Sequence, residues 1–492
     1  MTQVAENRTT ALLDRTPPAG RACVLYWMAA ARRLGWNFAL DRAVGWAQAL
    51  RLPLLVAEPL DADHPWASDR SHRFVLDGMA DNAAQAARHG VTYLPAVERR
   101  RGENLSLLRA LSARAAVVVT DRHPTLVVPR RLRTAASDID ARVEQVDGNG
   151  LLPLDDAPQA FGTAYAFRRH LQRRLPVHIR TAPAADPLRE LEGMDPASVP
   201  AEITTRWSTA RAPLDEAQRL ADLPIDHCVP PTGLRGGPKA ARQVLDRFLS
   251  SGLAGYGRSR AALEGESTSG LSPYLHAGHI STHEIVLRLL RDEGWLGDLS
   301  RRPTGAREGW WGVSAPAEAF LDELVTWREL GFNMCAHRDD YEQYESLPSW
   351  ARTTLDRHAS DERDHLYTLE AFEGARTHDP LWNAAERQLL REGRIQSYLR
   401  MLWGKKILEW AASPRDALAI MIGLNNKYAL DGCDPNSYSG IFWVLGRYDR
   451  PWAPERAVFG TVRYMSSEST ARKMRVKGYL AKYGDTSQPR LL

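Results

Sequence analysis

The chain has 492 residues and a formal net charge of +4; 44% of its residues are apolar and 25% are charged. This composition argues against a disordered or fibrous chain, and the length leaves room for two or more domains. Four widely spaced cysteines without a Cys-x-x-Cys pair argue against a disulfide scaffold and a zinc site, which favours a reducing, cytoplasmic setting. No apolar run reaches the ~18 residues of a membrane-spanning helix, so we expect no membrane association.

Residues 1–20 are polar and carry both charges, so we predict a disordered tail and no signal peptide. Residues 21–175 alternate short apolar strands with amphipathic helices. Continuous apolar strands of this kind predict a parallel sheet covered by helices on both faces, in a Rossmann-like α/β domain. No Gly-x-Gly-x-x-Gly motif follows the first strand, so no dinucleotide fingerprint is present. The expected strands are 22–28, 52–57, 92–94, 115–120 and 126–129, with one helix near 105–112 and another near Arg131.

Residues 176–231 are rich in Pro, Ala and acidic residues, which is typical of an interdomain connector. Helical periodicity dominates from 232 to 485 and predicts an all-α domain. From Arg391 to the C-terminus, seventeen Lys and Arg stand against nine Asp and Glu, a net charge of +8. Such a basic region is suited to phosphate contacts, although a solvated helical face gives the same pattern.

Capping residues set the limits of three successive helices in this domain. Asp379-Pro380 opens a helix that Gly393 ends, a second helix spans 394–410, and Ser413-Pro414 opens a third. Short connections make such helices antiparallel neighbours. The three helices carry, in order, Trp382, Trp403 with Trp410, and Asn425.

Trp403 and Trp410 are seven residues apart, about two turns or roughly 10 Å along one helical face. Indoles in a line beside amides and carboxylates suit a redox cofactor, whereas a well-packed aromatic core is the alternative.

The histidines at 276, 279 and 283 suggest a metal only superficially. Ser281 and Glu284 form a predicted capping box, so the helix starts after His279 and the pair at 279 and 283 does not share a face. We therefore expect no metal.

Five segments, in order along nearly the whole chain, carry a family resemblance. They resemble segments of the class II cyclobutane pyrimidine dimer photolyases, flavoenzymes of the photolyase/cryptochrome family. The segments are Tyr26–Met28, Ser269–His276, Phe320–Trp327, residues 376–452 and Val462–Met465.

The resemblance implies a monomeric lyase that repairs pyrimidine dimers in DNA, single or double stranded, using blue or near-ultraviolet light. Reduced FAD in the helical domain passes an electron to a flipped-out dimer and recovers it after the cyclobutane ring opens. The α/β domain of this family holds an optional antenna chromophore; a deazaflavin is one candidate and the absence of an antenna is the other.

The resemblance also implies two sets of FAD contacts. Arg400, Asn425 and Asp431 are expected beside the isoalloxazine, where the Asn425 carbonyl can accept from N5–H. Phosphate and ribityl contacts are expected from a hydroxyl-rich turn that, read alone, only caps a helix. They are Tyr256, Thr268, Ser269, Gly270, Leu271 and Ser272.

The lesion contacts implied by the resemblance centre on Glu323 and Trp327, which are four residues apart and so share a helical face. Trp327 would stack on the dimer, Glu323 would bond the base edges, Trp443 would form the other wall of an L-shaped pocket, and Met401 would fill its apolar edge. The expected DNA contacts beyond the pocket are Arg260, Trp452 and Arg463, and Arg463 would enter the space that the lesion leaves.

Trp403, Trp382 and Trp410 match the class II relay that reduces resting flavin in light, with Trp403 nearest the flavin and Trp410 towards solvent. Three alternatives stay open: a cryptochrome-like light receptor without repair activity, a repair enzyme for the (6-4) photoproduct, and a nucleic-acid-binding protein whose tryptophans are only core. The last predicts a colourless protein.

Overall fold

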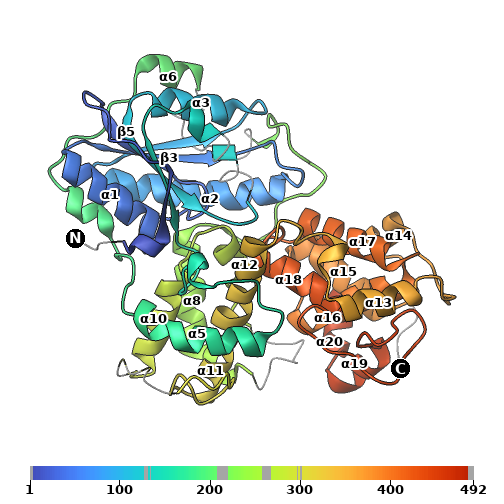
Figure 1. The fold of residues 1–492 in the computed structure, drawn as a ribbon. Coiled ribbons are helices and arrows are strands. Elements are labelled where there is room, and N and C mark those ends of the chain that lie inside the picture. The colour runs from blue at the N-terminus through green and yellow to red at the C-terminus, as the bar shows by residue number, and fades with distance from the viewer. Residues whose placement is uncertain are drawn as a thin grey trace. The chain divides into compact units, whose positions relative to one another are not determined.

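A computed structural model describes residues 4–126, 131–132, 135–207, 220–257, 268–295, 297, 299 and 302–485 (Figure 1). The chain forms two compact units. The α/β unit comprises Met1–Pro158, Gln172–Arg247 and Gly270–Arg302. The helical unit comprises Gln159–Leu171, Phe248–Ser269 and Pro303–Leu492.

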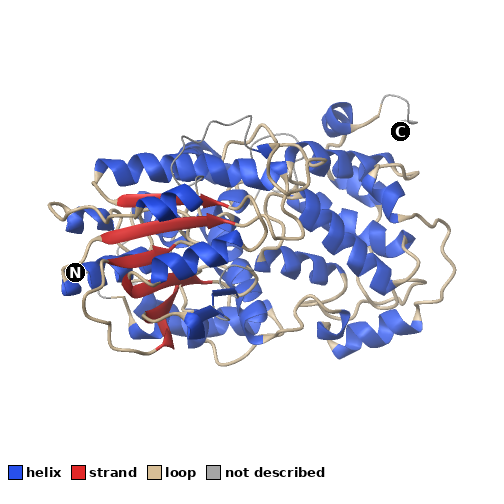
Figure 2. Cartoon of the chain, turned by 90° about the horizontal axis from the view of Figure 1, so that it is seen from above, coloured by secondary structure: helices blue, strands red, loops and turns tan. Residues whose placement is uncertain are grey.

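A six-stranded sheet forms the centre of the α/β unit, in the order β1-β6-β5-β2-β3-β4 (red in Figure 2). All neighbouring pairs are parallel except β1 with β6, which is antiparallel. The predicted Rossmann-like α/β domain followed by helices is confirmed. The strands are β1 (Thr9–Leu13), β2 (Cys23–Trp27), β3 (Leu54–Leu60), β4 (Thr92–Val97), β5 (Ala115–Arg122) and β6 (Arg142–Asp147).

Helices bury both faces of this sheet, which explains its uninterrupted apolar strands. Along β2, the side chains of Cys23, Leu25 and Trp27 belong to the core on the α3 face, while Val24 and Tyr26 belong to the core on the α1 face. This is the two-residue period of a strand. The helices of this unit are α1 (Phe38–Leu50), α2 (Asp69–Arg88), α3 (Glu103–Ser112), α6 (Ala201–Arg206), α8 (Pro238–Arg247), α9 (Ser272–His276) and α10 (Thr282–Asp292).

Three sequence predictions about the α/β part need correction. The predicted disordered tail 1–20 contains β1, which pairs with β6, and both strands are absent from the prediction. The predicted connector 176–231 packs on the unit, because Leu188 and Leu191 join the core on the α1 face. The helices α8, α9 and α10 lie in the α/β unit, although the prediction assigned them to the helical domain. The expected strand at 126–129 lies outside the described residues except for Leu126.

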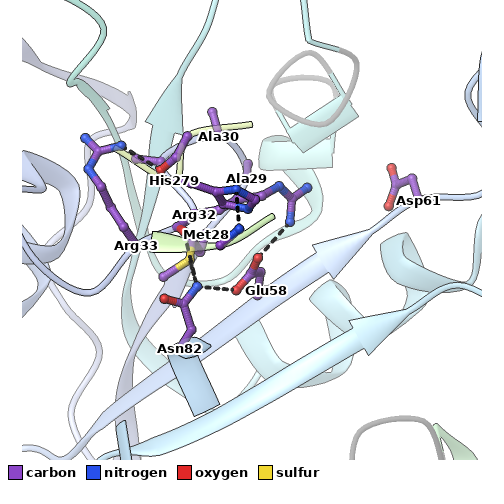
Figure 3. A network of polar contacts seen from close by, with 12 residues as sticks. Met28, Ala29, Ala30, Arg32, Arg33, Glu58, Asp61, Asn82 and His279 are labelled. Atoms are coloured by element: carbon purple, nitrogen blue, oxygen red, sulfur yellow. Dashed lines mark hydrogen bonds and ion pairs between the residues drawn. The ribbon is translucent and has the colours of Figure 1, made fainter. Parts of the chain in front are cut away.

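Buried acids at the carboxyl end of the sheet hold the loops in place. Figure 3 shows one of them, Glu58, with Arg32 and Asn82. The Asp121 carboxylate accepts from Tyr26 Oη and from the backbone N–H groups of Ala29, Ala30 and Ala31, at 2.7–3.0 Å. Three consecutive N–H groups of this kind form an anion-binding nest, which the protein's own carboxylate occupies. Beside it, Glu58 accepts from three side chains, namely Arg32 (3.2 Å), Asn82 (2.9 Å) and Tyr93 (2.6 Å).

The helical unit follows the predicted caps closely. Asp379 caps α15, Gly393 ends it in a left-handed conformation, and Ser413 caps α17. Helix α5 (Ala164–His178) begins in this unit's part of the chain. The other helices are α11 (Ala315–Leu321), α12 (Arg328–His337), α13 (Ser349–Arg357), α14 (Leu369–Glu373), α15 (Pro380–Glu392), α16 (Ser397–Trp410), α17 (Pro414–Tyr428), α18 (Pro435–Val444), α19 (Ser467–Lys473) and α20 (Lys477–Tyr483).

Within this unit, α15 packs on α16, α16 packs on α17 and α18, and α12 packs on α18. These contacts bring the predicted site residues of the helical unit onto adjoining elements. In the part of the chain that the structure describes, no helix is long and apolar enough to cross a membrane.

Candidate functional site

Three predicted relay tryptophans lie on α15 and α16 in the interior of the helical unit. Trp382, Trp403 and Trp410 are all at most 3% exposed. The Trp382 indole N–H donates to the backbone oxygen of Trp403 at 3.0 Å. The ring centroids of Trp382 and Trp410 are 6.2 Å apart, at an interplanar angle of 69°. The order Trp403–Trp382–Trp410 is therefore an unbroken path of contacts through the protein.

The outer end of this path differs from the prediction. Trp410 was expected towards solvent, yet it is 3% exposed. Its ring packs in edge-to-face geometry against those of His378 and Tyr367, with centroid distances of 4.9 and 5.8 Å. Tyr367 Oη and His378 Nδ1 share a hydrogen bond of 2.8 Å. Trp410 is buried because the exposed His378 and the half-buried Tyr367 cover its ring.

A buried acid beside the relay is missing from the sequence prediction. Glu386 lies one turn after Trp382 on α15, and its Oε2 accepts from the Trp403 indole N–H at 2.6 Å. Burial raises the pKa of Glu386 to about 8; the indole hydrogen bond works against this rise, and the charge of Glu373 adds to it. The i, i+4 spacing from Trp382 was the available signal, because it puts both side chains on one helical face.

The predicted lesion residues also meet, although with a different geometry. Trp327 and Trp443 are stacked, with centroids 4.6 Å apart and an interplanar angle of 14°. They are nearly parallel, so the expected L-shaped arrangement is wrong for this structure. The reason lies partly in the backbone: Glu323 and Trp327 stand on a π-helical turn, η8 (Asp322–Trp327), between α11 and α12. Glu323, Trp327, Trp443 and Met401 are each half-buried.

Such π-turns occur mostly inside α-helices and often at functional sites. They insert one residue per turn and so rotate the side chains that follow. The helix was predicted as regular α, because the local sequence carries no signal for this extra residue.

The predicted isoalloxazine residues lie on α16, on α17 and after α17. Arg400 forms an ion pair with Asp431 at 3.1 Å, while Arg400 Nε is buried without a hydrogen-bond partner among the described residues. The buried amide nitrogen of Asn425 donates to Ser437 Oγ at 2.5 Å and to Asn426 Oδ1 at 3.3 Å. None of the described residues donates to the Asn425 amide oxygen.

This donor and acceptor set fits a flavin. A buried guanidinium nitrogen without a partner and an amide oxygen that remains an acceptor are the groups that an isoalloxazine ring with carbonyls and an N5–H can satisfy. Asn425 is not a helix cap, since α17 continues to Tyr428 and the residue after it, Ala429, is the C-cap.

The structure describes the predicted phosphate-contact residues 268–272, whereas residues 258–267 lie outside the described part of the chain. Thr268 is exposed, Leu271 is buried, and Gly270 has a positive φ of 67° just before α9, which has Pro273 in its first turn. Thr268 and Ser269 end a stretch of the helical unit, and Gly270, Leu271 and Ser272 begin a stretch of the α/β unit. In the helical unit, Tyr256 packs edge-on against Phe248 and Phe320.

A cationic and aromatic patch occupies the segment after α18. Trp452 is 37% exposed, and its indole N–H donates to Asp449 Oδ1 at 3.0 Å. The guanidinium carbons of Arg450 and Arg463 lie 5.0 and 5.2 Å from the centre of the Trp452 ring. Two cations over one exposed indole provide a surface for a phosphate backbone and for bases. Arg450 is absent from the prediction, and the predicted Arg260 lies outside the described residues.

Comparisons with known proteins show the family of the chain. Residues 24–188 match the family model of DNA photolyase. The chain is 34% identical over 480 residues to the deoxyribodipyrimidine photo-lyase of Methanothermobacter thermautotrophicus, covering 96% of this chain and 97% of that protein. It is 34% identical over 487 residues to the deoxyribodipyrimidine photo-lyase of Oryza sativa subsp. japonica, covering 93% and 87%.

One solved structure shares the fold. It is the crystal structure of a bacterial class III photolyase from Agrobacterium tumefaciens, with a TM-score of 0.66 at 19% identity. The match covers 95% of this chain and 87% of that one.

Proposed function

Because the chain belongs to the DNA photolyase family, we propose that it uses light to split cyclobutane pyrimidine dimers in DNA, as a class II member. The chain is a lyase, and the bonds broken are the carbon–carbon bonds of the cyclobutane ring. The observation that carries the proposal is the contact path Trp403–Trp382–Trp410 on α15 and α16. Helix α16 also carries Arg400, and it packs on α17, which carries the buried Asn425.

FAD in its reduced form, when bound, supplies the electron that light excites. The side chains around it have binding and tuning roles. Arg400, held by Asp431, puts positive charge beside the isoalloxazine. The Asn425 oxygen accepts from N5–H and so favours the reduced ring. The hydroxyls of Thr268, Ser269 and Ser272 stay our predicted phosphate contacts. A deazaflavin antenna in the α/β unit stays a prediction too.

The lesion side of the proposal rests on the stacked pair. A centroid distance of 4.6 Å leaves no room for a base between Trp327 and Trp443. The pair therefore acts as one aromatic wall against which the extruded dimer packs, and Glu323 on the π-turn bonds its base edges. The patch of Arg450, Trp452 and Arg463 then contacts the DNA around the extruded bases, and its charge makes binding weaker at higher salt.

The test is repair of a single thymine dimer in an oligonucleotide by dithionite-reduced protein, in light and in darkness. We expect recovery of intact thymines only in light, and its loss in Glu323→Ala. Tyr165→Ala, which changes an exposed aromatic of the same unit, is the matched control and should repair normally. A yellow protein that photoreduces but repairs no dimer would instead indicate a light receptor.

A further inference from the structure

Glu386 is the buried acid closest to the relay, and its surroundings leave its charge uncompensated. It is fully buried on α15, with Oε2 on the Trp403 indole N–H and Oε1 without a hydrogen-bond partner among the described residues. The charge of another acid, Glu373, raises the pKa of Glu386 further. Glu373 is itself paired with Lys427 and Tyr428, at 2.7 and 2.6 Å, so it brings no cation to Glu386.

An acid in such a place is neutral over much of the physiological pH range. An ionised carboxylate in an apolar interior without a cation is costly, so the group keeps its proton instead. Burial raises the pKa of Glu386 to about 8. Glu386 therefore accepts the Trp403 hydrogen bond as a neutral carboxyl group near pH 7 and as a carboxylate above about pH 8.

We propose that Glu386 is a positioning residue of the relay, whose neutral carboxyl keeps the indole proton on Trp403 and so lets positive charge move outward to Trp382. The inference rests on the proposed function, in which these tryptophans carry electrons to the flavin.

One electron leaves Trp403 for the photo-excited oxidised flavin, and Trp403 becomes a radical cation. A neutral Glu386 already carries a proton and cannot accept the Nε1 proton of Trp403. An electron from Trp382 therefore refills Trp403, and the positive charge moves on to Trp410. A thiol in solution supplies the last electron.

With Glu386 ionised, the outcome differs. The Nε1 proton crosses the 2.6 Å hydrogen bond to Oε2, leaving a neutral indolyl radical on Trp403 and a neutral acid. Refilling Trp403 from Trp382 then requires the proton to return from Glu386, which makes this otherwise nearly isoenergetic step uphill. Back transfer from a reduced flavin would need the same proton but would stay strongly downhill, so the separated charge is lost by that route. Flavin photoreduction should therefore fall as pH rises through about 8.

The experiment measures the yield of long-lived tryptophan radical and of flavin photoreduction after a flash, with a thiol as donor, from about pH 6 to about pH 9. Wild type should lose yield several-fold towards high pH, and Glu386→Gln should be flat, because the amide oxygen still accepts from the indole but cannot ionise. Glu392→Gln is the matched control on the same helix, where the acid pairs with Lys482, and it should follow wild type.

A flat wild-type profile, or an unchanged fall in Glu386→Gln, overturns the inference. A Trp403→Phe variant that photoreduces normally overturns the relay itself, which separates the two failures. A flavin-free readout covers the case in which Glu386→Gln fails to load flavin. The infrared band of a protonated buried carboxyl should disappear in wild-type apoprotein with a midpoint near pH 8, and a midpoint several units lower would refute the neutral state on which the inference depends.

Discussion

Two buried acids, one in each unit, show opposite uses of the same chemical group. Asp121 in the α/β unit receives four hydrogen bonds, three of them from consecutive backbone N–H groups. Glu386 in the helical unit receives one, from an indole. A fully satisfied carboxylate stabilises the loop around it, whereas a poorly satisfied one lowers stability and responds to pH.

Function in this fold is expected where buried polar groups lack partners. Buried polar groups normally have partners, so a buried atom without one requires a reason. In the helical unit, Arg400 Nε and Glu386 Oε1 are two of several such atoms among the described residues, and both lie on helices that also carry the relay tryptophans. Arg400 Nε is explained if a bound cofactor supplies its missing contact. Glu386 Oε1 is explained if this carboxyl group keeps its proton.

The largest expected effect is from removing the satisfied acid. Asp121→Ala leaves four buried donors without an acceptor, and we expect a loss of about 3–5 kcal/mol in the free energy of unfolding, measured with urea. The control is Asp140→Ala, whose exposed side chain pairs with Arg21, and it should cost under about 1 kcal/mol. Equal losses in both variants would mean that pairing is not what distinguishes Asp121.

The second prediction has the opposite sign. The folded-state pKa of Glu386, about 8, lies above its ordinary value of 4.5, so its contribution to stability is complete below about pH 4.5 and is lost as pH rises through 8. Between about pH 6 and pH 9, Glu386→Gln should therefore gain about 2–3 kcal/mol relative to wild type in urea unfolding of the apoprotein. A gap that stays constant with pH would show that Glu386 is already ionised in the fold.

The third prediction tests the aromatic wall. Trp443→Ala removes one of two stacked rings, and we expect binding of a dimer-containing oligonucleotide to weaken by about 1–3 kcal/mol, measured by fluorescence titration. Binding of the undamaged oligonucleotide should change little, because the patch around Trp452 stays in place. Trp443→Phe should recover part of the loss. Equal weakening for damaged and undamaged DNA would place Trp443 outside the lesion pocket.

Much of the scaffold was predictable because its signals are local. The caps Asp379 and Ser413 and the stop at Gly393 set helix limits from a few residues each. Strand β6 was missed because Arg142–Asp147 is largely polar. Its buried Glu144 pairs with Arg142 on the same strand and with Arg42, which is 102 residues away in the chain, so a local window shows only part of its compensation.

In the site, too, features set by local sequence could be predicted and features set by packing could not. Trp382, Trp403 and Asn425 could be assigned to neighbouring helices from caps and short loops. The parallel stack of Trp327 on Trp443 could not be predicted, because it depends on the extra residue in the π-turn η8 and on how α12 packs on α18. Glu386 could be placed beside Trp382 by spacing, but its lack of a cation is a property of the packed interior.

The smallest expected effect concerns a charged pairing at the surface. His358 shares hydrogen bonds with Asp361 Oδ2 (2.6 Å) and Glu455 Oε1 (2.9 Å), and Asp361 also accepts from the Val458 N–H. These contacts tie the segment that carries Trp452 to the end of α13. The carboxylates of Glu455 and Asp361 raise the pKa of His358, so the tie is complete below the ordinary value of 6.5 and weakens as pH rises through the raised one.

Tryptic cleavage after Arg456, which Ala457 follows, measures this tie. The ratio of the rate in His358→Gln to that in wild type removes the protease's own pH dependence. The ratio should exceed one at about pH 6 and approach one at about pH 9. Exposed ion pairs contribute little, so the change should be far smaller than that at Asp121. A ratio above one at both pH values would mean that the imidazole holds the segment by shape and hydrogen bonding, and that charge matters in this unit only where it is buried.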